Sequence, residues 1–199
     1  MIIKTEELSL NSIYHTLTQS IVPRPVAWVL SENDDHSHNL APFSYFNAVA
    51  SEPPLISISI TNKGSGYKDT FDNILNRGYF VVHIADVDMV EKMNSTSAPL
   101  AKNHSELEEF GIEVVEVEGW PLPRIVQSKI AMLCSTYQIV PLGNVHMIVG
   151  EIKQIFIDET IITPHESRLI IDPKLLNPVS RLGGTLYATL GQIIDLPRP

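Results

Sequence analysis

Residues 54–61 of the chain read PLISISIT, and this stretch decides the fold class. In a β-strand, successive side chains point to opposite faces, so the three isoleucines share one face while Ser57, Ser59 and Thr61 share the other. Such strict alternation predicts a strand of an antiparallel sheet with its isoleucine face buried. The other face carries small hydroxyl groups that suit contact with a ligand.

A cation and a hydroxyl follow at the start of a predicted helix. After a glycine-punctuated turn at Asn62 to Gly66 comes Lys68-Asp69-Thr70, and then the helical stretch Phe71 to Arg77. The first amides of a helix favour an anion, to which Lys68 adds a charge and Thr70 a donor. Beside the hydroxyl face, this set suits a flat ligand with a phosphate tail. The alternative is that Asp69 or Thr70 simply caps the helix. The common glycine-rich nucleotide loops are absent from the sequence.

The rest of the chain favours strands over helices. Further strands are expected at 26–31, 39–47, 79–85, 112–117, 129–140 and 145–158, and a hairpin connection at 141–144 joins the last two. Short helices are expected at 10–19, 71–77 and 86–94, and before Phe110, where Ser105 and Glu108 have capping-box spacing. This order predicts a mainly β fold with short helices, an antiparallel Greek-key barrel, closed or nearly closed. We expect a single domain, 1–199, with residues 172–199 as a C-terminal extension.

Composition excludes several classes of function. The 199 residues carry a net charge of −9, which repels phosphate backbones, so no nucleic-acid partner is expected. No apolar run approaches the ~20 residues of a membrane helix, and the N-terminus lacks the features of a signal peptide. We therefore expect a cytoplasmic protein without a membrane partner. The single cysteine, Cys134, excludes an intrachain disulfide and is interpreted as a buried structural thiol.

Two more stretches hold candidate ligand contacts. In the stretch 41–48, Asn47 stands at a predicted strand end, where its amide suits a ring carbonyl or ring nitrogen; the alternative is an ordinary core strand in which Asn47 satisfies a turn. Arg24 lies between Pro23 and Pro25, which hold its backbone extended. Its guanidinium is suited to a phosphate and equally to a surface ion pair.

Four ordered blocks of the chain resemble the flavin reductase-like, FMN-binding split-barrel proteins. The blocks are PRPVAWV at 23–29, NLAPFSYFN at 39–47, Pro53-Pro54, and Lys68-Asp69-Thr70 with Asn73-Ile74. The RLGG sequence at 181–184 with Tyr187-Ala188 resembles a motif of the longer members. The resemblance implies a split β-barrel that binds FMN. It also implies a homodimer with its flavin sites at the subunit interface, each completed by the second chain.

The resemblance implies roles for individual residues as well. Asn47, Ala48 and Val49 would border the isoalloxazine ring. The residues implied along the ribityl chain and phosphate are Ser57, Ser59, Lys68 and Thr70, with Arg24, Arg181 and Tyr187 as further candidate contacts. His146 resembles the histidine that some reductases place near the nicotinamide, and a core or rim histidine is the alternative. The chain departs from the family pattern at Val145, where a polar residue is usual, and in the turn 32–38, which has no glycine.

The implied function is an FMN-dependent oxidoreductase. Hydride would pass from NADH or NADPH to bound or exchangeable flavin, and the reduced flavin would serve a monooxygenase component, another acceptor or oxygen. One alternative is an FMN-binding electron carrier without nicotinamide-dependent activity. A second is a small barrel that binds oligonucleotides, which the negative charge disfavours. The histidines are scattered, and His36 and His38 lack a nearby carboxylate or cysteine pattern, so no metal site is expected.

Overall fold

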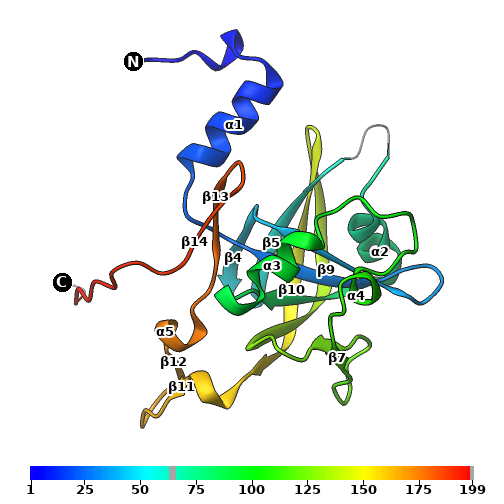
Figure 1. Ribbon diagram of the computed structural model, residues 1–199, viewed down its shortest axis with the longest axis vertical. Coiled ribbons are helices and arrows are strands. Elements are labelled where there is room, and N and C mark those ends of the chain that lie inside the picture. The colour runs from blue at the N-terminus through cyan, green and yellow to red at the C-terminus, as the bar shows by residue number, and fades with distance from the viewer. Residues whose placement is uncertain (63–65, 198–199) are drawn as a thin grey trace.

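The computed structural model describes residues 1–62 and 66–197, and its main body is a seven-stranded antiparallel sheet. The strand order is β3-β2-β6-β9-β10-β5-β4, and Figure 1 labels β4, β5, β9 and β10 of this sheet. The strands are Ala27–Glu32 (β2), His38–Phe43 (β3), Phe46–Ser51 (β4), Pro54–Thr61 (β5), Tyr79–Ile84 (β6), Ile130–Leu142 (β9) and Val145–Ile157 (β10). The predicted mainly β, antiparallel architecture is confirmed.

Shorter elements surround this sheet. The helices are Leu10–Ser20 (α1), Asp69–Arg77 (α2), Val90–Ser95 (α3), Glu106–Glu109 (α4) and Pro173–Leu176 (α5), with 3-10 turns at Thr5–Glu7, Val87–Met89 and Glu159–Ile161. Small sheets are formed by Arg24–Pro25 (β1) with Ser180–Gly183 (β13) and Leu186–Ala188 (β14), by Val114–Val115 (β7) with Arg124–Ile125 (β8), and by Ile162–Thr163 (β11) with Ile170–Ile171 (β12). Helix α1 stands away from the large sheet, beside the β13–β14 hairpin (Figure 1).

The predicted alternation of β5 is confirmed. Ile56, Ile58 and Ile60 are buried, whereas Ser57 and Ser59 are only partly covered. The helix that follows ends as predicted, because Gly78 adopts the left-handed conformation of a helix cap. The predicted turn at Asn62 to Gly66 falls largely outside the described residues.

The single strand predicted at 39–47 is wrong. The chain leaves β3 at Phe43 and enters β4 at Phe46. Strand β3 pairs with β2 at one edge of the sheet, and β4 pairs with β5 at the opposite edge. Between them, the Tyr45 carbonyl already accepts the Ser59 N–H at 2.9 Å. The chain therefore changes strand partners at residues 44–45, although its sequence still reads as one continuous strand.

Two smaller predictions are corrected too. The strand predicted at 112–117 is limited to Val114–Val115. The capping box fails at Ser105, which precedes α4 but makes no side-chain cap bond. Its hydroxyl instead donates to the His38 carbonyl at 2.7 Å, because β3 runs close to this helix. The contact joins α4 to the sheet.

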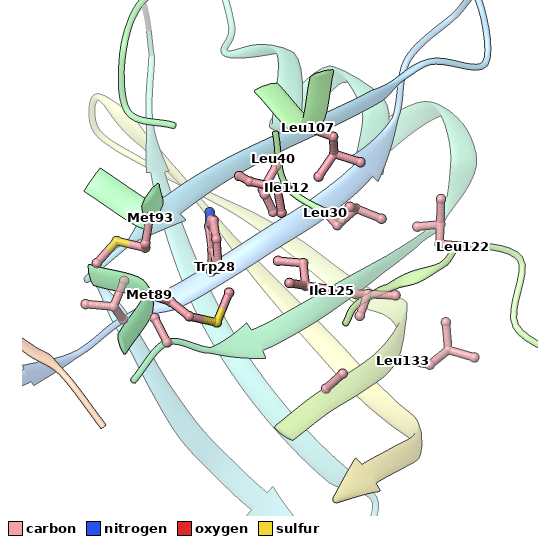
Figure 2. Close-up of a cluster of buried hydrophobic side chains, with 14 of the residues drawn as sticks. Trp28, Leu30, Leu40, Met89, Met93, Leu107, Ile112, Leu122, Ile125 and Leu133 are labelled. Atoms are coloured by element: carbon pink, nitrogen blue, oxygen red, sulfur yellow. The ribbon is translucent and has the colours of Figure 1, made fainter. Parts of the chain in front are cut away.

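Strand β2 is buried on both faces, which explains its continuous apolar run. Trp28 and Leu30 belong to one hydrophobic cluster, while Ala27 and Val29 belong to a second. Figure 2 shows Trp28 in the middle of the first cluster, close to Met93 of α3. The first cluster joins the sheet to α3, α4 and the 112–125 segment, and the second joins it to α2. Burial of a strand on both faces fixes its register firmly.

His83 of β6 is fully buried beside the first cluster, where the 112–125 segment covers it. Its Nδ1 lies 3.2 Å from the Trp28 carbonyl oxygen, to which it donates, and its Nε2 accepts the Ile125 N–H at 3.0 Å. Burial lowers the pKa of His83 to about 4. Both ring nitrogens are thus used by the neutral imidazole.

Acid is therefore expected to weaken the fold through His83. Between its ordinary pKa of 6.5 and its folded value of about 4, the unfolded chain binds a proton that the folded chain does not. The stabilisation is fully present above pH 6.5 and falls as the pH falls through this window. The expected loss is about 3 kcal/mol between pH 7 and pH 4. Urea unfolding at both pH values measures it, and His83→Gln should have a clearly smaller pH dependence; an unchanged dependence in that variant would contradict the assignment.

Candidate functional site

Helix α2 begins without a side-chain cap. Lys68 is its N-cap residue, and a lysine side chain has no acceptor atom for the first amides. Asp69 and Thr70 lie inside the helix, so neither fills the cap position proposed as the alternative reading. The helix start, with its partial positive charge, therefore stands next to a lysine.

Thr70 is buried, and its hydroxyl is oriented by Asn39 of β3. Thr70 Oγ1 accepts a hydrogen bond from Asn39 Nδ2 at 2.8 Å. A hydroxyl has one proton to donate as well as lone pairs to accept. Because the Asn39 amide occupies a lone pair, the Thr70 O–H remains to donate toward a ligand.

A buried polar network holds α2 against β2 and β3. Asn73 Nδ2 donates to Ser31 Oγ at 3.1 Å and to Asn33 Oδ1 at 2.8 Å. Asn39 lies 3.5 Å from the same Ser31 hydroxyl, so the two amides meet there. All these side chains are buried. In such surroundings, satisfied hydrogen bonds fix a geometry firmly, and here they fix the position of Thr70.

A cavity of about 260 Å³ opens beside the start of α2. Its walls come from β3, the start of α2, α4 and the segment after α3, and its lining residues are Asn39, Ala41, Pro42, Phe43, Lys68, Asp69, Thr70, Thr96, Ser97, Ala98, Pro99, Leu100 and Glu106. Lys68 Nζ lies 5.5 Å from the centre of the Phe43 ring. The cavity thus combines a cation, a hydroxyl donor and an aromatic wall.

Two buried hydrogen bonds fix the far wall of this cavity. Trp28 Nε1 donates to Thr96 Oγ1 at 2.9 Å, which ties the 96–100 segment to the sheet. Glu106 Oε2 accepts the Leu40 N–H at 2.8 Å. Burial raises the pKa of Glu106. The carboxyl lines the cavity while one of its oxygens is engaged by the Leu40 amide.

Three more hollows continue this cavity along the surface. A hollow of about 180 Å³ shares Pro42 and Ser97 with it, and contains Arg181 and Tyr187. A third hollow, of about 320 Å³, is also lined by Arg181 and Tyr187. The fourth, of about 430 Å³, shares Ser44 with the 180 Å³ hollow. The four hollows adjoin one another through shared lining residues, and we call this series of hollows the site groove. Its mixed polar and apolar walls suit a cofactor with polar and aromatic parts.

The residues predicted around the ring lie on the β4 edge of the sheet. Asn47 is the cross-strand partner of Ser57, so their side chains share one face, and Asn47 also lines the 430 Å³ hollow. Ala48 and Val49 are exposed along the same edge strand. The structure thus brings Asn47 to the site groove, whereas Ser57 and Ser59 lie on the neighbouring sheet surface.

His146 of β10 lies near the start of α2. Its Nδ1 is 3.0 Å from Asn62 Oδ1, and its ring centre is 4.6 Å from that of Phe71 and 5.1 Å from that of Tyr67. Phe71 directly follows Thr70 in α2. His146 therefore stands near Lys68 and Thr70, although it does not line the described cavity.

Arg24 and Tyr187 line two other hollows of the site groove. Arg24 is buried, and its Nη1 donates to the Thr18 carbonyl and, at 2.6 Å, to the Ile21 carbonyl at the end of α1. These backbone carbonyls hold the Arg24 guanidinium in place of the predicted phosphate or surface ion pair. Tyr187 donates its hydroxyl to Asn94 Oδ1 at 3.0 Å.

Other reactive groups lie apart from the groove. Burial raises the pKa of Cys134 to about 12, which keeps the thiol protonated and inert. Across residues 1–62 and 66–197, no three His, Cys, Asp or Glu side chains are grouped so as to hold a metal ion. In the same residues, none of the helices combines the length and apolar character needed to cross a membrane.

Comparison with known proteins decides the family. A model of the flavin reductase like domain matches residues 19–169 of the chain. The chain is a member of the flavin reductase-like family. The predicted split-barrel fold is thereby confirmed, together with the resemblance drawn from the four sequence blocks. The matched region leaves the expected domain boundary at residue 172 as a prediction.

Solved structures resemble this family member closely. Nitrilotriacetate monooxygenase component B from Bacillus cereus superposes with a TM-score of 0.93 at 37% sequence identity, covering 98% of each chain. The 2-nitrobenzoate 2-nitroreductase NbaA from Pseudomonas fluorescens gives 0.90 at 32% identity, covering 100% of this chain and 96% of the other. By sequence, YwrF of Bacillus subtilis (strain 168) is 32% identical over 204 residues, covering 100% of this chain and 98% of the relative.

Sequence reasoning missed several residues that shape the groove. Asn39 and Asn73 stand in the sequence only as members of the family blocks, and the bonds from Asn39 to Thr70 and from Asn73 to Ser31 and Asn33 span 31 to 42 residues. Ser97 and Glu106 line the cavity from segments that carried no site signal. The one usable signal was the presence of polar residues, such as Asn39, within otherwise apolar strands.

Proposed function

We propose that this protein binds FMN and uses it as an oxidoreductase that takes hydride from NADH or NADPH. The observation that carries the proposal is the anion corner formed by Lys68 and Thr70, which opens into the site groove. Membership of the flavin reductase-like family supports the same conclusion. One similar solved structure is a monooxygenase component, which suggests that such an activity supplies a monooxygenase with reduced flavin.

The residues of the corner fit the phosphate of FMN. A dianionic phosphate needs donors and positive charge, and here Lys68, the Thr70 O–H and the start of α2 supply them. The cavity wall also contains Phe43, an apolar surface for the remainder of the ligand. The Thr70 hydroxyl is buried, so an acceptor on the ligand would satisfy its proton.

The protein's own groups hold and orient the reactants. FMN, when bound, supplies the acceptance of a hydride from the nicotinamide. Lys68 and Thr70 would hold the phosphate, with Ser57 and Ser59 near the ribityl chain, and Asn47 with the exposed edge at Ala48 and Val49 would border the ring. Edge-strand N–H groups suit the ring's carbonyl oxygens, because such groups lack a strand partner. His146 would stand on the nicotinamide side, where its Nδ1 is already oriented by Asn62.

A homodimer is proposed to complete the site. Strand β4 is an exposed edge on which Val49 is 53% exposed, and helix α1 exposes Leu10, Tyr14 and Leu17. An apolar surface of this kind is unusual for a chain that acts alone. A second copy would cover it and bring its own residues to the groove. Sedimentation of the FMN-loaded protein tests this: a monomer at micromolar concentration would refute it.

Anaerobic reduction distinguishes the proposed enzyme from an electron carrier. The FMN-loaded protein should lose its visible flavin absorbance on addition of NADH or NADPH. A carrier without nicotinamide-dependent activity would keep its colour with both nucleotides and lose it only with dithionite. The partner supplied with electrons is proposed to be a monooxygenase component, as the name of the Bacillus cereus relative suggests.

A further inference from the structure

The second cation of the site groove is Arg181. It lies at the wall between the 180 Å³ hollow and the 320 Å³ hollow, and lines both. Ser44 and Ser97 line the smaller hollow beside it. This corner belongs to the C-terminal hairpin β13–β14, outside the family-matched region that ends at residue 169.

The Arg181 guanidinium is held in place by two contacts, and one of these is itself anchored. It stacks on the Tyr187 ring, 4.4 Å from the ring centre, and its Nη2 donates to the Gly184 carbonyl. Tyr187 in turn is anchored to Asn94 of α3. A guanidinium has five N–H donors, and within residues 1–62 and 66–197 the bond to Gly184 is the only one that this side chain makes. The remaining donors are pre-organised for an anion.

The other cations of the site groove indicate which anion Arg181 would bind. Within residues 1–62 and 66–197, three cations line the site groove, and Arg24 is engaged with the carbonyl groups of α1. Lys68 stands at the corner proposed for the single phosphate of FMN. Arg181 is therefore the cation of the groove that neither α1 nor the proposed FMN phosphate engages, and in a protein of net charge −9 such a cation is a local attraction for a second anion.

We infer that Arg181 binds the pyrophosphate of the reduced nicotinamide dinucleotide, with its guanidinium braced by Tyr187. The inference rests on the proposed function and assigns the donor's place in the groove. The nicotinamide would then lie toward the 430 Å³ hollow, where Asn47 would border the flavin ring, and the adenosine in the 320 Å³ hollow. That hollow contains Glu91 and Thr185, whose polar atoms suit ribose hydroxyls. Arginine matches phosphate oxygens through paired N–H groups, as lysine cannot.

Stopped-flow reduction of the FMN-loaded protein tests the inference. Arg181→Gln should weaken the apparent affinity for NADH roughly 10-fold to 100-fold, the loss expected for charge-assisted hydrogen bonds. Reduced nicotinamide riboside carries no phosphate, so the variant and the unaltered protein should use it equally well. Arg168→Gln is the matched control, because Arg168 is exposed and lies outside the groove. The FMN dissociation constant, measured by flavin fluorescence, should change less than about twofold in both variants.

The other outcomes overturn the inference. Equal use of NADH by the variant and the unaltered protein would remove Arg181 from donor binding. A defect that persists with reduced nicotinamide riboside, or a large loss of FMN affinity, would assign Arg181 to the flavin. Calorimetry with ADP-ribose separates this inference from the proposed function, since it needs no hydride transfer. Binding that depends on Arg181 without reduction by NADH would support the pyrophosphate site and refute the enzyme.

Discussion

Replacing Lys68 with alanine and Thr70 with valine should weaken FMN binding roughly 100-fold or more, because charge-assisted hydrogen bonds contribute about 1.5–3 kcal/mol each. Riboflavin lacks the phosphate, so its weaker binding should change less than about threefold. The ratio of the two dissociation constants, measured by quenching of flavin fluorescence, reports the phosphate corner alone. Any general loosening of the groove affects both ligands and cancels in this ratio.

Matched variants separate charge, hydroxyl and fold at this corner. Lys68→Arg keeps the charge and Thr70→Ser keeps the hydroxyl, so each should retain most of the FMN preference. Thr70→Val alone removes the acceptor of the buried Asn39 amide and should lower the free energy of unfolding by about 1–3 kcal/mol. Equal losses of affinity for FMN and riboflavin in the double variant would move the phosphate site elsewhere.

Local patterns were sufficient to predict the elements that bury one face. The alternation in β5 and the left-handed Gly78 after α2 depend only on neighbouring residues, and the structure bears both out. The helix at 10–19 was also predicted, because its apolar spacing is local. Its partner was not: Leu10 and Leu17 remain exposed in the single chain. A periodic pattern indicates that a helix has an apolar side and leaves open what covers that side.

The strand pairing and the buried polar network could not be read from spacing. The break between β3 and β4 arises because the two strands occupy opposite edges of one curved sheet, a choice made by long-range pairing. The hydrogen bond that orients Thr70 comes from Asn39, 31 residues earlier. Single polar residues in apolar strands point to such networks, but their partners emerge only once the chain is folded.

Asn73 is expected to be the most sensitive position of that network. Its amide links α2 to the β2 end, and Asn73→Leu removes the hydrogen bonds that it donates to Ser31 Oγ and Asn33 Oδ1. The expected loss is about 2–4 kcal/mol of unfolding free energy. Urea unfolding measures it at constant pH. Asn76→Leu is the control, since Asn76 is exposed on the same helix and its substitution should cost less than about 0.5 kcal/mol.

The same variant tests whether the network positions the anion corner. If Asn73 holds α2 in place, Asn73→Leu should also lower FMN affinity more than riboflavin affinity, because the shift of the helix moves Thr70 and leaves the outer sheet surface unchanged. This selective effect distinguishes a positioning role from a purely structural one, which would reduce both affinities together. If the Asn73→Leu variant is as stable as the Asn76→Leu variant, water or other side chains replace the lost amide. The hydroxyl of Thr70 would then be oriented by Asn39 alone.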